Sequence, residues 1–160
     1  MTDITTYQIA NDILRIAIPA GIVVVGWWIV SSQNDKRERR KEIRAIVEDL
    51  RKTILEIRED TVKYYGTENK ISVGSLSDKI KLNFLLVSQY LLLLKNAGMV
   101  LNVTAELIAL RKTATGGFFE SKDFHKQTEN PKWLSNLCSE SVELVLAIEK
   151  AYFMSFPVKL

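Results

Sequence analysis

The feature that most constrains this chain is a run of fifteen apolar or small residues without a charge, from Ile16 to Val30, and a dense basic segment that begins at Lys36. Strands are usually about 4–8 residues long, so this run is too long for a strand. A secretory signal peptide has its positive residues before the apolar core and a cleavage site of small residues after it. Here only Arg15 precedes the run, and no A-x-A pattern follows it. The remaining interpretations are a membrane span and a buried core helix.

We predict that residues 13–32 form a transmembrane helix. The hydrocarbon core of a bilayer is about 30 Å thick, and about 20 mostly apolar residues cross it as a helix. The single charge in this range, Arg15, lies close enough to one end to extend its side chain toward the headgroups. Trp27 and Trp28 lie near the other end, where indole rings commonly occupy the interface. These features favour the span over the buried core helix.

The basic residues after the span predict its orientation. Lys and Arg gather on the cytoplasmic side of membrane helices, and residues 1–12 contain neither. We therefore expect a single-pass protein of the inner cell membrane, with residues 1–12 outside and residues 33–160 in the cytoplasm. The residues expected at the membrane interface are Arg15, Trp27, Trp28, Lys36, Arg37, Arg39, Arg40 and Lys41. Glu38 and Glu42 are interspersed among the basic residues, so a solvated helix start explains this segment equally well.

A long amphipathic helix is expected over residues 33–65, next to the membrane. Its apolar residues recur at spacings of 4, 3, 4 and 3, which is a heptad seam. The seam consists of Ile43, Val47, Leu50, Ile54 and Ile57. It can pair with a second copy as a coiled coil, or it can pack on later helices of its own chain. Because three heptads are marginal for an independent coiled coil, intramolecular packing is favoured.

Residues 66–160 are expected to form a small helical domain that packs with this helix. Two helices are predicted, at about 76–112 and at about 131–154. Asn130 and Pro131 supply the cap and the first residue of the second helix. The fold class is therefore all-α, with an N-terminal transmembrane helix, a long amphipathic helix and a small cytoplasmic helical bundle.

The stretch 82–103 is apolar enough to raise the alternative of a second membrane span. Against this alternative, Lys95 would lie within the bilayer, where a central lysine costs roughly 2.5–3.5 kcal/mol on insertion scales. A core helix that contacts its neighbours on several sides explains the pattern at less cost.

No motif in the sequence indicates catalysis. The single histidine, His125, and the single cysteine, Cys138, are too few for a metal site built from these residue types. Gly116-Gly117 lacks the Lys and the Ser or Thr of a phosphate-binding loop. The net charge of +3 is concentrated just after the span, which argues against a nucleic-acid surface. We expect a protein that is not an enzyme, with no cofactor, metal, nucleic acid or small-molecule substrate.

Without such sites, the chain is expected to act through contacts with the lipid bilayer and with a protein partner or a second copy. Aromatic residues often contribute much of the binding energy of an interface. The candidate contact residues are Tyr64, Tyr65, Phe118, Phe119, Phe124 and Trp133. The same aromatic residues can instead close the core of the domain. The leading expectation is a membrane-anchored helical protein that mediates interaction or self-association at the cytoplasmic face.

The segment WWIVSSQNDKRERRKEIRAIVEDLRKTILEI, residues 27–57, resembles the junction between span and helix in small bacterial single-pass membrane proteins. Some of those proteins belong to prophages, and some resemble membrane effectors of anti-phage loci such as retrons. The resemblance implies a bacterial source and a role in antiviral defence. It supports a second hypothesis, a membrane-perturbing effector or toxin whose span oligomerises and leaks ions. The second span at about 82–103 belongs to this hypothesis, and no functional residue is carried over.

Overall fold

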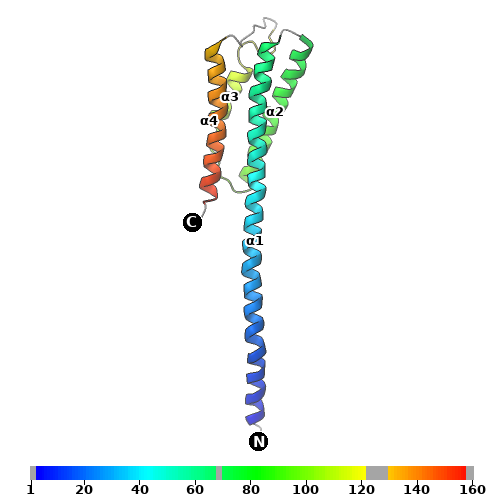
Figure 1. Ribbon diagram of the computed structural model, residues 1–160, viewed down its shortest axis with the longest axis vertical. Coiled ribbons are helices and arrows are strands. Elements are labelled where there is room, and N and C mark those ends of the chain that lie inside the picture. The colour runs from blue at the N-terminus through cyan, green and yellow to red at the C-terminus, as the bar shows by residue number, and fades with distance from the viewer. Residues whose placement is uncertain (1–2, 68–69, 122–129, 158–160) are drawn as a thin grey trace. The chain divides into compact units, whose positions relative to one another are not determined.

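The computed structural model describes residues 3–67, 70–121 and 130–157, and Figure 1 shows the helices that they form. Within the helices, the side chains of residues 3–26, 29, 32, 33 and 70–72 lie outside the description. The elements are α1 (Asp3–Gly66), α2 (Lys70–Asn96), α3 (Thr104–Thr115) and α4 (Pro131–Ser155). Every regular element of the described residues is a helix, so the all-α fold class is confirmed.

The chain divides into two compact units, Met1–Glu42 and Ile43–Leu160. The described part of the first unit is helical and belongs to α1. Among the residues with a description, no helix is both long enough and apolar enough to cross a membrane. The side chains of residues 13–26, which make up most of the predicted span, lie outside the described residues.

The second unit is a bundle in which successive helices run in opposite directions, as Figure 1 shows. One end of the bundle holds the end of α1, the end of α3 and the start of α4. There the hydroxyl of Tyr65 donates a hydrogen bond to the carbonyl of Gly116, at 3.0 Å. The indole Nε1–H of Trp133 donates to the carbonyl of Thr113, at 3.2 Å. α3 and α4 also pack directly on each other.

The other end of the bundle joins α4 to the early part of this unit. Arg44 of α1 forms an ion pair with Glu149 of α4. The backbone N–H of Val100, between α2 and α3, donates to the hydroxyl oxygen of Ser155, at 3.3 Å. These contacts at both ends establish the antiparallel order of the four helical segments.

The heptad seam forms the α1 side of the core. All five seam residues, Ile43, Val47, Leu50, Ile54 and Ile57, are at most 2% exposed. They pack with apolar residues of the other three helices, among them Val87, Leu110 and Leu144. The seam is therefore buried within a single chain. Of its two interpretations, this is packing on later helices of the same chain.

The sequence predicts one helix over about 76–112, whereas the structure has α2 and α3 with a break between them. Gly98 adopts a left-handed backbone conformation, with φ of 89°. Its N–H donates to the carbonyl of Lys95, and the N–H of Met99 donates to that of Leu94, both at 3.0 Å. This pair of bonds is the Schellman motif, which ends α-helices at a glycine. Residues 82–103 consequently do not form one continuous helix, as a second span would require.

The N-terminus of α4 is capped as its sequence indicates. The side-chain oxygen of Asn130 accepts a hydrogen bond from the backbone N–H of Trp133, at 3.2 Å. Pro131 is the first helical residue, where its missing N–H leaves no hydrogen bond unmade. α4 ends at Ser155, against a predicted range of about 131–154.

Candidate interaction surface

α2 carries apolar residues on two opposite faces. One face points into the bundle and holds the buried residues Ile80, Phe84, Val87 and Leu94. Because successive helical residues are about 100° apart, the remaining leucines lie on the opposite side. They are Leu82, Leu85, Leu86, Leu92 and Leu93, and their exposed fractions range from 39% to 57%. We call these five residues, with Gln89 at their centre and Asn96 at one end, the leucine face.

The leucine face is a continuous apolar stripe. From Leu82 to Leu94 the sequence contains no charged residue. Single exposed leucines are common on protein surfaces, but a contiguous apolar patch marks a site of interaction. Burying a fully exposed leucine side chain contributes about 1.5–3 kcal/mol. Since these leucines are about half exposed, covering each of them would contribute about 1 kcal/mol before the cost of association.

A charged cluster lies at the N-terminal end of the leucine face. The ammonium of Lys81 contacts the carboxylates of Asp78, at 2.9 Å, and Glu120, at 2.7 Å. The hydroxyl of Ser77 also donates to Glu120, at 2.8 Å. The bond from Lys81, followed by that from Ser77, lowers the pKa of Glu120. The bond to Glu120, followed by that to Asp78, raises the pKa of Lys81. Two carboxylates and one ammonium give this cluster a net charge of −1.

A positive residue lies in the last turn of α2, to the side of the leucine face. Lys95 lies in the last turn of α2 and is exposed. Among the described residues no ion pair to Lys95 is found. The leucine face is therefore neutral, with the negative cluster near its start and Lys95 beside its end.

The predicted aromatic contact residues mostly close one end of the bundle. Tyr64 and Tyr65 are buried, with their rings 4.9 Å apart, and the Tyr65 ring lies 5.0 Å from that of Trp133. Phe118, Phe119 and Trp133 are half-buried and pack against the core. Phe124 lies outside the described residues. In this structure, the aromatic cluster is a packing unit of the domain itself.

Hydrogen bonds fix the two buried tyrosines in place. The hydroxyl of Tyr64 accepts a bond from the backbone N–H of Glu120, at 2.8 Å. The hydroxyl of Tyr65 donates to the carbonyl of Gly116. Burial, followed by the proximity of Tyr64, raises the pKa of Tyr65 to about 12. Tyr65 therefore stays neutral as a hydrogen-bond donor at physiological pH.

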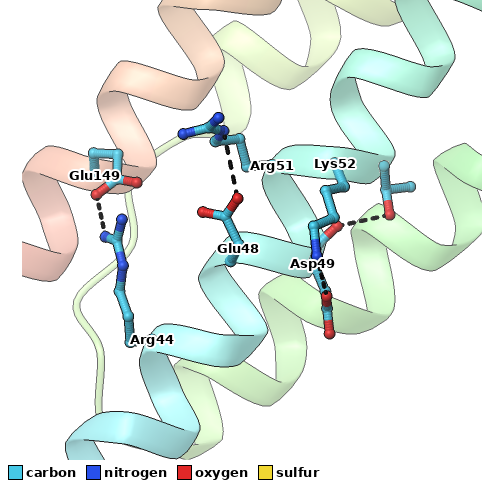
Figure 2. A network of polar contacts seen from close by, with 7 residues as sticks. Arg44, Glu48, Asp49, Arg51, Lys52 and Glu149 are labelled. Carbon is cyan, nitrogen blue, oxygen red and sulfur yellow. Dashed lines mark hydrogen bonds and ion pairs between the residues drawn. The ribbon is translucent and has the colours of Figure 1, made fainter.

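Ion pairs on α1 include one that reaches another helix. Figure 2 shows the side chains of Arg44 and Glu149 pointing toward each other from α1 and α4. The distance from Nη1 of Arg44 to Oε2 of Glu149 is 2.5 Å. The bond from Arg44 to Glu149 raises the pKa of the guanidinium. Two further pairs lie within α1 and are exposed: Arg51–Glu48 at 3.9 Å and Lys52–Asp49 at 3.5 Å. These contacts hold helices rather than build a chemical site.

The residues predicted at the membrane interface belong to the first unit. Trp27 and Trp28 are 70% and 68% exposed. The five basic residues Lys36, Arg37, Arg39, Arg40 and Lys41 are exposed as well. The side chain of Arg15 lies outside the description.

A hollow of about 500 Å³ lies between α3 and α4, lined by Tyr65, Lys112, Trp133 and Glu140 among others. Cys138, the single thiol, is half-buried on α4. Within the described ranges no three His, Cys, Asp or Glu side chains are grouped to hold a metal ion. His125 lies outside those ranges. The leucine face gathers five exposed leucines on one helix, and further exposed apolar residues, among them Val142, Leu146 and Phe153, lie on α4.

No family model, curated protein or solved structure matches this chain. The resemblance of residues 27–57 to membrane proteins of phage-related loci therefore stays a prediction.

Proposed function

We propose that this chain is a membrane-anchored helical protein without enzymatic activity, and that it works by protein–protein contact through the leucine face of α2. The observation that carries the proposal is the second apolar face of α2. Five leucines lie on one stripe of a helix whose opposite stripe is already buried in the core. Such a stripe adds nothing to the stability of the isolated domain. Covering it with a partner removes apolar surface from water, which is favourable.

The spacing of the leucine face suits recognition between helices. Its residues recur at intervals of three, four and seven along α2, which is the pattern that packs an amphipathic helix into a groove or against a second helix. Gln89 is the polar residue at the centre of the stripe, and it offers both a donor and an acceptor. A protein surface can satisfy this amide, while the hydrocarbon of a bilayer cannot.

The proposed anchor is the helix predicted at residues 13–32. Its support is the order of residues along the chain, with an uncharged run, then Trp27 and Trp28, and then the basic segment. Exposed Lys and Arg near an anionic membrane surface each contribute about 1 kcal/mol to binding it. In this proposal the bundle lies on the cytoplasmic side of the membrane.

Site-specific photo-crosslinking in cells tests the contact surface. A photoreactive residue is placed at Leu85 of the leucine face or at Leu146 of α4, which are 57% and 60% exposed. We expect crosslinked protein adducts from position 85 and few from position 146. If the two positions give the same adducts at the same yield, α2 has no special role in contact and the proposal fails.

Labelling of Cys138 tests the anchor and its orientation. Cells with an opened outer barrier and an intact inner membrane are treated with a membrane-impermeant maleimide. Because Cys138 is half-buried, denatured lysate shows the full extent of labelling. We expect protection in the cells and labelling after lysis. Labelling in cells with an intact inner membrane would contradict the cytoplasmic location.

A further inference from the structure

We infer that one end of the second unit rests on the surface of an anionic lipid bilayer, with Val100, Phe153 and Met154 in the headgroup layer. These three residues are named the apolar tip. The inference rests on the membrane anchor of the proposed function and adds a second contact with the same bilayer. Three observations carry it: the exposure of the apolar tip, the charge around it and its place in the chain.

The apolar tip holds the most exposed apolar side chains of the second unit. Val100 is 81% exposed, Met154 73% and Phe153 57%. Elsewhere in the described part of this unit, no large apolar side chain is more than 60% exposed. The backbone N–H of Val100 donates to the hydroxyl oxygen of Ser155, at 3.3 Å. The connection from α2 to α3 and the end of α4 therefore share this exposed apolar surface.

Packing behind the apolar tip joins it to α1. The ring of Phe153 lies 5.7 Å from that of Tyr152. The guanidinium of Arg44 lies 5.4 Å from the centre of the Tyr152 ring, and it also pairs with Glu149. The apolar tip thus belongs to the end of the unit at which α1 enters.

Two lysines lie next to the apolar tip. Lys95 is in the last turn of α2, and its carbonyl accepts the hydrogen bond from Gly98 in the connection that holds Val100. Lys150 lies four residues before Met154, on the same side of α4. Both lysines are exposed, and among the described residues no ion pair to either is found.

No carboxylate of the adjoining segments offsets these lysines. Residues 95–105 and 150–157 contain neither Asp nor Glu. The nearby Glu149 is already paired with Arg44. Apolar side chains beside lysines are the combination that an anionic bilayer surface attracts, because the apolar groups enter the headgroup layer and the ammonium groups meet the lipid phosphates.

The predicted anchor is attached to this same end. The link between the predicted span, residues 13–32, and the start of the second unit at Ile43 consists of residues 33–42. These ten residues are helical and extend about 15 Å. The opposite end of the unit, at Tyr65, lies about 33 Å further along α1. Of the two ends, the one with the apolar tip is therefore held nearer the bilayer.

The lengths of the helices match the depth of the headgroup layer. Along α1, Arg44 follows Ser32 by twelve residues, about 18 Å. α4 continues beyond Glu149, the partner of Arg44, for six residues to Ser155, about 9 Å in the opposite direction. The two lengths differ by about 9 Å. The headgroup layer, about 5–8 Å deep on each side of a bilayer, and the side chains of the apolar tip cover this difference.

The bilayer is favoured over a protein as the occupant. The anchor keeps the lipid surface at a high effective concentration, so the contact does not require the recruitment of a second molecule. The boundary between headgroups and acyl chains also accepts apolar side chains without a surface of complementary shape.

Quenching by spin-labelled lipids tests the inference. The full-length chain is placed in vesicles of three parts phosphatidylcholine and one part phosphatidylglycerol, with nitroxides near the headgroups. A fluorophore is attached at Met154→Cys in a Cys138→Ser background, and we expect several-fold quenching. Ser135→Cys is the matched control, exposed on the same helix and about 28 Å away, and is expected to stay bright. Equal quenching at both positions, or none at position 154, overturns the inference.

Charge reversal tests the part of the lysines. Lys95→Glu and Lys150→Glu together are expected to reduce the quenching at position 154 several-fold, because glutamates are repelled by phosphatidylglycerol. Both side chains are exposed, so the fold is expected to persist, and circular dichroism checks it. Vesicles of phosphatidylcholine alone are expected to give a similar reduction. Unchanged quenching in both cases would overturn the assignment to an anionic surface.

Flotation of the same vesicles in alkaline carbonate separates this inference from the anchor. If the chain floats while position 154 stays bright, the anchor stands and the contact of the apolar tip is overturned. If the chain does not float, both fail. If position 154 stays bright in vesicles but reacts slowly with a permeant maleimide in cells, a protein covers the apolar tip in place of the bilayer.

Discussion

Lys79 of α2 holds the carboxylate of Asp60 of α1 at 2.9 Å, and the Asp60 side chain is only 3% exposed. Lys63 contributes a longer contact at 3.8 Å. A buried carboxylate is costly unless a cation pairs with it. The pair therefore links α1 to α2 next to Ile80, which belongs to the buried face of α2.

Removing the closer cation is expected to destabilise the bundle. We predict that Lys79→Ala lowers the free energy of unfolding by about 1–2 kcal/mol, because Asp60 stays buried with only the distant Lys63 to compensate it. Lys52→Ala breaks an ion pair whose two members are both exposed, so its effect is expected to stay within about 0.5 kcal/mol. Denaturant unfolding of both variants measures the difference. Equal losses would show that the burial of Asp60 does not matter.

Tyr65 is expected to make the fold sensitive to alkaline pH. Its pKa is about 12 in the folded chain against an ordinary 10.0, so the folded state holds this proton more tightly than the unfolded state. The resulting stability is fully present below pH 10 and is lost as the pH rises toward 12. We predict that Tyr65→Phe removes this part of the alkaline slope in unfolding free energy. At neutral pH the same variant is expected to cost about 1 kcal/mol, since the carbonyl of Gly116 loses its donor.

Tyr90→Phe serves as the control for Tyr65→Phe, because Tyr90 lies on α2 away from the carbonyl of Gly116. The alkaline slopes of the two variants are compared by denaturant unfolding at several pH values. An unchanged slope in Tyr65→Phe would contradict the assignment.

Glu120 is expected to make the stability of the fold depend on pH in the acid range. Its pKa is lowered, first by the bond from Lys81 and then by that from Ser77, so the folded state favours the carboxylate. The contribution is present above the ordinary pKa of 4.5 and disappears as the pH falls through the lowered value. We predict that Glu120→Gln and Lys81→Met each flatten the acid limb of the stability profile, and that the double variant flattens it by less than the sum of the two. Additive effects would show that the two side chains act separately.

Replacement of two glycines by alanine is expected to change the stability of the fold in opposite directions. Gly98→Ala forces a Cβ into the left-handed conformation that ends α2, so we predict a loss of about 1–2 kcal/mol. Gly74 lies within α2, and a Cβ there would meet nothing within 4 Å. Gly74→Ala is therefore expected to stabilise the fold by about 0.5–1 kcal/mol. Thermal unfolding of the pair measures both signs, and a stabilising Gly98→Ala would refute the assigned helix end.

The seam on α1 could be predicted because its spacing is a local property of the sequence. Apolar residues from Ile43 to Ile57 repeat with the heptad period, and the structure buries all of them. The cap at Asn130 is local in the same sense, since its side chain accepts the hydrogen bond from the backbone N–H of Trp133, three residues later. The sequence pattern does not predict the end of α2 at Gly98, because the apolar residues on both sides of this glycine suggest one continuous helix.

The leucine face could not be assigned from the sequence alone. Between Leu82 and Leu94 the apolar residues cover nearly the whole circumference of α2, which suggests a helix surrounded by neighbours. Which stripe is buried depends on contacts far along the chain, such as that of Lys79 with Asp60. The same holds for Tyr64 and Tyr65, because only the fold brings Gly116, Glu120 and Trp133 into contact with them.

The accessibility of position 85 in intact cells tests the contact role of the leucine face most directly. Leu85→Cys and Leu146→Cys are compared in a Cys138→Ser background, with a membrane-permeant maleimide and denatured chain as the reference. The two side chains are almost equally exposed in the folded chain. If a partner covers the leucine face, position 85 labels several-fold more slowly than position 146 in cells, and the two label alike after denaturation. Equal labelling rates in cells would show that the leucine face is uncovered and would contradict its role in contact.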